Sequence, residues 1–342
     1  MKARLWMAVI TIAALISAPF SFAADEKLGI FEAIHASAVS FDETTAAVEA
    51  ALAKSGLVLH AQHDVRVPEN KHRARVYVLT SPAYADAAKA EAARTISAQI
   101  LRLAVYTLGA DQKTYVNMAN PVAHAMVFYA DSKNYGALLA AARSAAGEMR
   151  QLVADVPGKA MAEQQEPIRS EKHYNKFKGD GPARMMAKFR TFEKSQLLIA
   201  EDTAENFDTV VENVKKALSS STVSGIDEST GWEQVAAIKL RDDAVYIGVT
   251  NPYIEDKMVR INSRFRSEGK SDESPYPGVD HVTALPTDIL VIKDGSETLV
   301  LHYGQMWRMQ LYFWDSGYRA FTANVGVPSA IASSIEDTLR VE

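Results

Sequence analysis

A long internal repeat constrains the fold of this chain more than any other feature. Short matches recur in the same order in residues 24–156 and in residues 195–342. They pair Phe41-Asp42 with Phe207-Asp208, Val76-Tyr77-Val78 with Val245-Tyr246-Ile247, Ser81-Pro82 with Asn251-Pro252, and Tyr129-Ala130-Asp131-Ser132 with Phe313-Trp314-Asp315-Ser316. The period of roughly 170 residues is too long for a solenoid repeat and matches a whole domain. We therefore predict two tandem homologous domains.

Each copy has the same predicted order of elements. Ser40 and Glu43 form a capping box that starts a helix, and Asn206 takes the cap position in the second copy. Strands, a second helix and a hairpin follow, with Asp294-Gly295 as a strong turn signal. This order predicts an α+β fold in which helices pack on a mainly antiparallel sheet. The expected elements are strands over 28–39, 75–79, 125–129, 196–200, 244–249 and 309–314, hairpins over 101–118 and 289–303, and helices over 84–100, 135–153, 252–265 and 329–339.

Residues 1–23 read as a signal peptide. Lys2 and Arg4 precede an apolar stretch, and Ser21-Phe22-Ala23 supplies small residues for cleavage after Ala23. An uncleaved anchor is the alternative. No later stretch of the sequence is long and apolar enough for a transmembrane segment. We expect an exported, periplasmic protein.

Composition excludes several functions. The chain has no Cys, so it has no disulfide, thiolate nucleophile or Cys-ligated metal. Without residues 1–23, 35 Lys and Arg face 42 Asp and Glu. This acidic balance argues against nucleic acid as a partner.

A basic segment separates the copies. Residues 157–194 contain several Pro and Gly, and an excess of Lys and Arg over Asp and Glu. His173 to Lys178 interleave aromatic and basic residues, and Met185, Met186, Phe189 and Phe192 add apolar side chains. We expect a linker that packs on the acidic domains. A docking segment for an acidic partner or a lipid headgroup is the alternative.

The second copy resembles the domain of unknown function 302 family. The resemblance rests on Val245 to Pro252, where Asn-Pro opens a helix after a buried strand, and on Leu285-Pro286 before a hairpin. The first copy departs from it, with Ser81-Pro82 and Arg102-Leu103 at the matching places. Many members carry a Cys before Asn-Pro, where this chain has Thr250 and Thr80. The resemblance implies a compact α+β domain, often in tandem, and no established activity.

Two groups of residues are candidate metal ligands. His60, His63 and His72 could hold zinc or copper if a turn brings them together, although i and i+3 on a strand face opposite sides. Surface histidines around a loop are the alternative. Soft thioethers beside an imidazole suit copper(I), and core packing by Met is the other reading. The residues of that second group are His124, Met126, Met306 and Met309.

Aromatic residues are the candidate ligand-binding group. They occur on or beside the two predicted aromatic strands, and could line a pocket beneath those strands or at the domain interface. Core packing is the alternative. The residues are Tyr106, Tyr115, Tyr129, Tyr303, Trp307 and Trp314.

No catalytic motif is present. The chain lacks a G-x-S-x-G elbow, a phosphate-binding loop and H-E-x-x-H. We therefore expect a non-catalytic binding protein for a small apolar ligand, a metal or an envelope protein, with no cofactor indicated. The alternatives are a cofactor- or metal-dependent enzyme of sulfur or redox metabolism and a copper-binding protein.

Overall fold

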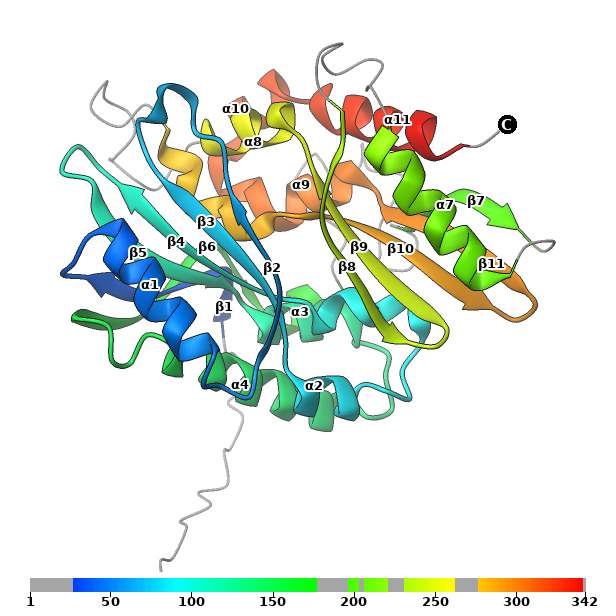
Figure 1. Ribbon diagram of the computed structural model, residues 1–342, viewed down its shortest axis with the longest axis horizontal. Helices are drawn as coiled ribbons and strands as arrows, with labels where there is room; N and C mark the ends of the chain where they lie inside the picture. The colour runs from blue at the N-terminus through cyan, green and yellow to red at the C-terminus, as the bar shows by residue number, and fades with distance from the viewer. Residues whose placement is uncertain (1–26, 177–195, 203–205, 221–230, 262–275, 341–342) are drawn as a thin grey trace, which may run out of the picture.

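The computed structural model describes residues 27–176, 196–202, 206–220, 231–261 and 276–340. It contains two antiparallel sheets with helices packed on them, which confirms the predicted α+β fold (Figure 1). The predicted signal peptide lies outside the described residues. Among the residues that are described, no helix has the length and apolar character to cross a bilayer.

The first sheet has six strands, in the order β2-β3-β4-β5-β1-β6. Its strands are β1 (Lys27–Ser37), β2 (Val58–Asp64), β3 (Ala74–Thr80), β4 (Leu101–Leu108), β5 (Lys113–Ala119) and β6 (Gly158–Ser170). The helical segments of this half are α1 (Phe41–Leu52), α2 (Pro82–Ala87), α3 (Pro121–Phe128), α4 (Tyr135–Gln151), α5 (Glu171–Asn175), and the 3-10 segments η1 (Pro68–Asn70) and η2 (Ala93–Gln99).

The second sheet has five strands, in the order β7-β11-β10-β9-β8. Its strands are β7 (Gln196–Asp202), β8 (Glu233–Arg241), β9 (Ala244–Thr250), β10 (Thr287–Asp294) and β11 (Glu297–Tyr303). The helical segments of this half are α7 (Phe207–Ser220), α8 (Pro252–Val259), α9 (Gln305–Phe313), α10 (Gly317–Ala323), α11 (Val327–Leu339), and the 3-10 segments η4 (Pro277–Ala284) and η5 (Trp314–Ser316).

The two sheets share one topology. The order β1-β5-β4-β3-β2 in the first half matches β7-β11-β10-β9-β8 in the second, strand for strand in chain order. Two irregularities also agree: β1 bulges at Ile34 and β7 at Ile199, and β2 bulges at His60 and β8 at Val235, while a further bulge of β8 at Leu240 has no counterpart in β2. Bulges are conserved features of related sheets, so this agreement supports our interpretation of a duplicated domain.

Polar side chains start the helices as predicted. Ser40 and Glu43 form a reciprocal capping box, in which each side chain accepts the backbone N–H of the other. Ser81 and Asn251 cap α2 and α8, with Pro at the next position of each. Asn206 accepts the backbone N–H of Thr209 before the second turn of α7. These residues satisfy backbone groups that a helix end leaves unpaired.

The predicted aromatic strands are wrong. Residues 125–129 lie mostly in α3 and residues 309–314 mostly in α9, both of which are helices. Asn120 accepts the backbone N–H of Val122 and caps α3, with Pro121 as its first residue. All eight residues of α3 are buried, so the segment shows no polar face. A short, fully apolar run does not distinguish a buried helix from a buried strand.

Two further segments differ from expectation. The helix predicted over 84–100 ends at Ala87, and a buried 3-10 segment, η2, takes its second part. η2 packs on β9 and β10 of the other half, and this tertiary packing overrides the helix propensity of its alanines. Where a linker was expected from residue 157, β6 pairs with β1 and α5 follows. Residues 177–194 of the expected linker, with its Met and Phe residues, lie outside the described residues.

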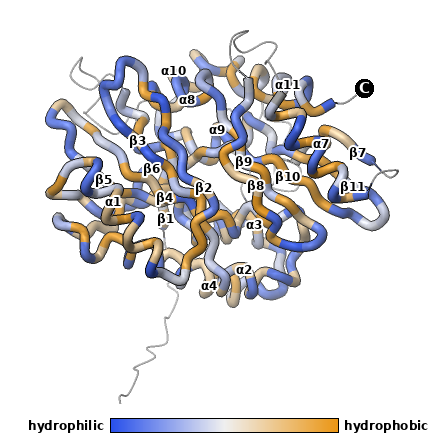
Figure 2. Tube along the Cα trace, viewed as in Figure 1, coloured by the Kyte–Doolittle hydropathy of each residue, from blue (hydrophilic) through white to orange (hydrophobic). Residues whose placement is uncertain are grey.

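The two halves form one body with a common hydrophobic core. η2 of the first half packs on the second sheet, and η4 of the second half packs on β3, β4 and β5. The edge strands β2 and β8 lie side by side near the middle of the molecule (Figure 1). Figure 2 shows apolar residues along the strands and between the helices, where the buried side chains lie.

β6 also ties the halves together. Its buried Arg169 donates hydrogen bonds to the backbone carbonyls of Gln310 (2.7 Å) and Leu311 (3.0 Å), in the second half of α9. A cation at this end of a helix stabilises its unpaired carbonyl groups. The strand thus fixes the position of α9, which carries a large part of the site described next.

Candidate ligand-binding site

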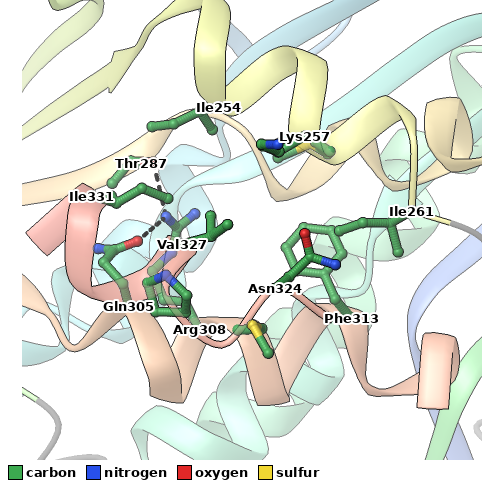
Figure 3. Close-up of a pocket in the computed structure, with 13 residues that line it drawn as sticks. Ile254, Lys257, Ile261, Thr287, Gln305, Arg308, Phe313, Asn324, Val327 and Ile331 are labelled. Carbon is green, nitrogen blue, oxygen red and sulfur yellow. Dashed lines mark hydrogen bonds between the residues drawn. The ribbon is translucent and has the colours of Figure 1, made fainter. Parts of the chain in front are cut away.

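A pocket lies among α8, α9 and α11 of the second half (Figure 3). Its space measures about 600 Å³, part of which is open to solvent. Most of its lining is apolar, from Ile254, Met258, Ile261, Met309, Phe313, Val327, Pro328 and Ile331. Its polar lining comes from Lys257, Thr287, Gln305, Arg308 and Asn324. An apolar wall with few polar groups is typical of a small-molecule site.

The local sequence explains the apolar walls. Asn251 accepts the backbone N–H of Ile254 and starts α8, so that Ile254 and Met258 fall one turn apart on the same face. Val327 and Ile331 are likewise one turn apart on α11. Figure 3 shows Ile254 on one side of the space and Val327 and Ile331 on the other.

Arg308 forms the polar end of the pocket. Its side chain is 7% exposed, and it donates hydrogen bonds to the Thr287 hydroxyl (2.8 Å), the Ala284 carbonyl (2.8 Å) and the Gln305 side chain (3.3 Å). Figure 3 draws the bonds to Thr287 and Gln305. Its Nε is buried and makes no hydrogen bond with any described residue. One N–H of a buried cation is therefore left unsatisfied.

A buried polar network connects Arg308 with the first half. The Asp288 carboxylate lies 3.9 Å from Arg308 Nε, too far for a hydrogen bond, and accepts a short hydrogen bond from Arg102. Arg102 also donates to the Tyr312 hydroxyl at 3.3 Å, and that hydroxyl lies 2.9 Å from His124 Nε2. One buried carboxylate thus serves two buried guanidiniums.

These neighbours determine the protonation of the network. Burial and the guanidiniums of Arg102 and Arg308 lower the pKa of His124 to about 3, so its imidazole is neutral. Burial also raises the pKa of the Tyr312 phenol above its ordinary value. Burial lowers the pKa of Arg102, but Asp288 and two tyrosines outweigh this effect and raise the pKa above its ordinary value. Arg102 therefore stays charged. The network carries more positive than negative charge.

A second buried cluster surrounds His281. Its Nδ1 lies 2.9 Å from Asp280 and its Nε2 lies 3.1 Å from Asp315. Burial lowers the pKa of His281, but Asp315 and Asp280 outweigh this effect and raise it to about 10. His281 is therefore an imidazolium held between two carboxylates. Its ring lies 5.6 Å from that of Phe313, a pocket residue.

A third cluster joins β2 to α8. The carboxylate of Glu255 is fully buried and lies 2.6 Å from His63 Nε2. It also accepts hydrogen bonds from the Arg66 backbone (2.8 Å) and from the Thr250 hydroxyl (3.0 Å). Residues of the first half thereby hold α8, one wall of the pocket, in place.

The predicted histidine ligands make separate contacts. His60 lies 2.8 Å from the Thr80 hydroxyl, His63 contacts Glu255, and His72 Nδ1 lies 3.3 Å from Gln112 Oε1. Within the described part of the chain, no group of three or more His, Asp or Glu side chains could hold a metal ion. The sequence alone offered no sign that His63 would bind a carboxylate of the other half.

The predicted copper ligands lie on two helices. His124 and the fully buried Met126 belong to α3, and Met306 and Met309 belong to α9. His124 contacts Tyr312, and Met309 lines the pocket. Copper binding by these residues stays a prediction.

The predicted aromatic group does not assemble around the pocket. Tyr106 and Tyr115 stack on the first sheet with their centroids 5.9 Å apart, and Tyr303 lies 5.6 Å from Trp307. Tyr129 is buried at the end of α3, and Trp314 contacts Phe321. None of the six predicted residues is among those that line the pocket. This pocket lies inside the second half and beside a helix, and ligand binding by the six aromatic residues stays a prediction.

Sequence reasoning missed Arg308, Asp288 and Arg102. A usable signal exists in the alignment of the two copies. Arg102 and Asp288 are each the second residue of their strands, and His124 and Arg308 are each the fourth residue of their helices. These polar residues stand at equivalent places in segments that are otherwise mostly apolar, and they differ between the two halves. That combination predicts the buried network.

Comparisons with protein families, with curated proteins and with solved structures found no match to this chain. The resemblance to the domain of unknown function 302 family therefore stays a prediction.

Proposed function

We propose that this protein is a non-catalytic binding protein that holds a small apolar ligand in the pocket among α8, α9 and α11. The supporting observation is the pocket itself, whose lining is mostly apolar with a few polar groups at one end. A lining of this character suits a small organic molecule. On the strength of residues 1–23, we also propose that the protein acts in the periplasm.

The pocket chemistry favours binding over catalysis. The described residues that line it include no Asp, Glu, His or Tyr. Those side chains and Lys are the usual general acids and bases, and Lys257 is the one such group among the lining residues. The one lining hydroxyl, that of Thr287, accepts a hydrogen bond from Arg308 and has no neighbouring base among the lining residues. A site of this kind can orient and shield a ligand.

The test is calorimetric titration with octanol, a small apolar probe. Val327→Trp places a large ring in the pocket and should abolish binding, because the added atoms occupy the space of the probe. Val325→Trp is the matched control, since Val325 is 38% exposed and lies two residues away, outside the lining. Circular dichroism of both variants verifies folding. Absence of octanol binding to the wild type, or equal binding by both variants, would contradict the proposal.

A further inference from the structure

We propose that the natural ligand of this pocket is a small amphiphilic anion, whose acidic head group binds Arg308 and whose apolar part packs between α8 and α11. This inference rests on the proposed function and specifies its ligand class. It concerns Arg308 at the polar end of the pocket, because an entirely apolar ligand would offer no partner to its guanidinium. Four observations support it.

The first observation is the unsatisfied donor. Arg308 is only 7% exposed, and it lines the pocket. Its Nε makes no hydrogen bond with a described residue. Its other nitrogens bond only to neutral oxygens, those of Thr287, Gln305 and Ala284. Arg308 shares the Asp288 carboxylate with Arg102 and lies 3.9 Å from it, so the charge of Arg308 is only partly compensated and can attract an anion in the pocket.

The second observation is the charge balance. Among the described residues of the second half, four carboxylates are buried: Glu255, Asp280, Asp288 and Asp315. Glu255 is held by His63 and Arg66, and both Asp280 and Asp315 are held by His281. Asp288 is bound by Arg102 and reaches Arg308 only at 3.9 Å. Arg308 therefore lacks a carboxylate of its own among the described residues.

The third observation is a second cation at the same pocket. Lys257 lines it from α8, and its side chain is half-buried. Figure 3 shows Lys257 on the α8 wall, across the space from Gln305 and Arg308. All charged residues in the lining are thus cationic. This charge favours entry of an anion and disfavours a cationic ligand.

The fourth observation comes from the first half. The positions equivalent to Thr287 and Arg308 hold Leu101 and His124, each at the same place in its element. His124 is neutral, because burial and the nearby guanidiniums lower its pKa to about 3. At this position, the cation is therefore Arg308 of the second half, the half that has the pocket described above.

The test is titration of the purified protein with octanoate and octanol, which share one chain and differ in the head group. We expect octanoate to bind the wild type at least about tenfold more tightly than octanol, as a hydrogen bond to a charged group allows. Arg308→Gln should remove this preference by weakening octanoate about tenfold while octanol binding persists. Arg308→Lys keeps the charge and should retain part of the preference.

A matched control is Arg260, the C-cap residue of α8, the helix that carries Lys257. Arg260→Gln removes an exposed cation of the α8 region that pairs with Asp256 outside the pocket, and both affinities should stay unchanged. The wild-type comparison of the two probes does not depend on whether an Arg308 variant folds. Equal affinity of the wild type for both probes overturns this inference and leaves the proposed function standing. Binding of neither probe overturns both, and a preference that survives in Arg308→Gln overturns the role of Arg308.

Discussion

The two halves have the same strand order but differ in how their helices close over the sheet. In the first half, α2 and α3 both pack on α4, where Ala88, Ala142 and Ala145 are fully buried. In the second half, the equivalent helices α8, α9 and α11 carry larger side chains and leave a pocket between them. Small side chains allow helices to approach closely, whereas α8 and α11 carry the larger Ile254 and Ile331, which line the pocket. One topology therefore supports both tight helix packing in the first half and a pocket in the second.

The comparison extends to electrostatics. The first half contributes Arg102 and a neutral His124 to the shared network, and the second half contributes Asp288 and Arg308. Shared positions, such as the N-cap residues, serve folding in both halves. Positions that differ between the halves form the polar end of the pocket. We therefore expect function to depend on the positions at which the two halves differ.

The largest effect is expected from Asp288→Asn. The change leaves the guanidiniums of Arg102 and Arg308 buried without a carboxylate, and breaking a buried ion pair in this way costs about 3–5 kcal/mol. Equilibrium unfolding in urea measures the loss. Asp294→Asn is the matched control, because Asp294 lies on the same strand and pairs with Arg94 at the surface, where the expected loss is under about 1 kcal/mol. Similar, small losses for both variants would contradict the importance of the network.

The second prediction concerns pH, to which the two halves should respond in opposite ways. His124 has a folded pKa of about 3 and an unfolded value of 6.5, so only the unfolded chain binds its proton between these values. Stability is then lost as pH falls below 6.5. His281 has a folded pKa of about 10, so its contribution is fully present below pH 6.5 and is lost as pH rises toward 10. Each histidine should add a slope of up to about 1.4 kcal/mol per pH unit on its own side.

Urea unfolding at about pH 5, pH 6.5 and pH 8 measures both slopes. His124→Gln should flatten the acid side and leave the alkaline side unchanged. His281→Gln should do the reverse, although its overall stability is lower because two buried carboxylates lose their cation. If each variant kept the wild-type slopes on both sides, the assigned protonation states would be wrong.

The smallest effects test the packing difference directly. Ala142→Leu adds three carbons to the closed half, and overpacking a filled core costs about 1–3 kcal/mol. Val327→Phe adds four carbons on the pocket wall, where space exists, and should cost under about 0.5 kcal/mol. Thermal or urea unfolding compares the two. A cost for Val327→Phe as large as that for Ala142→Leu would show that the second half is as tightly packed as the first.

Local rules predicted much of the fold. Ser40, Ser81, Asn206 and Asn251 start helices because each offers a side-chain oxygen to backbone groups nearby in sequence. The Asp294-Gly295 turn sets its hairpin for a similarly local reason. The strands predicted over 125–129 and 309–314 are wrong, because these segments belong to α3 and α9. A segment that is buried on most sides has no hydrophobic period that separates helix from strand.

The site was much less predictable. The Arg102–Asp288 contact joins residues 186 positions apart, and His63 meets Glu255 at a separation of 192. No local pattern encodes such pairings, because they depend on how the two halves dock. Met309 was singled out as a metal ligand and lines the pocket in the structure. The sequence shows that Met309 is apolar. It does not predict that Met309 follows Arg308 on a helix that lines a pocket.

Arg102 and Asp288 occupy equivalent positions of the two sheets and contact each other. In a closed dimer of identical subunits, a side chain at the rotation axis meets its own copy, so an arginine there would face an arginine. A single polypeptide that carries both units has no such requirement. One position can be basic and its counterpart acidic, and His124 can differ from Arg308. The covalent connection of two like folds thus permits an asymmetric charged centre that two identical subunits could not build.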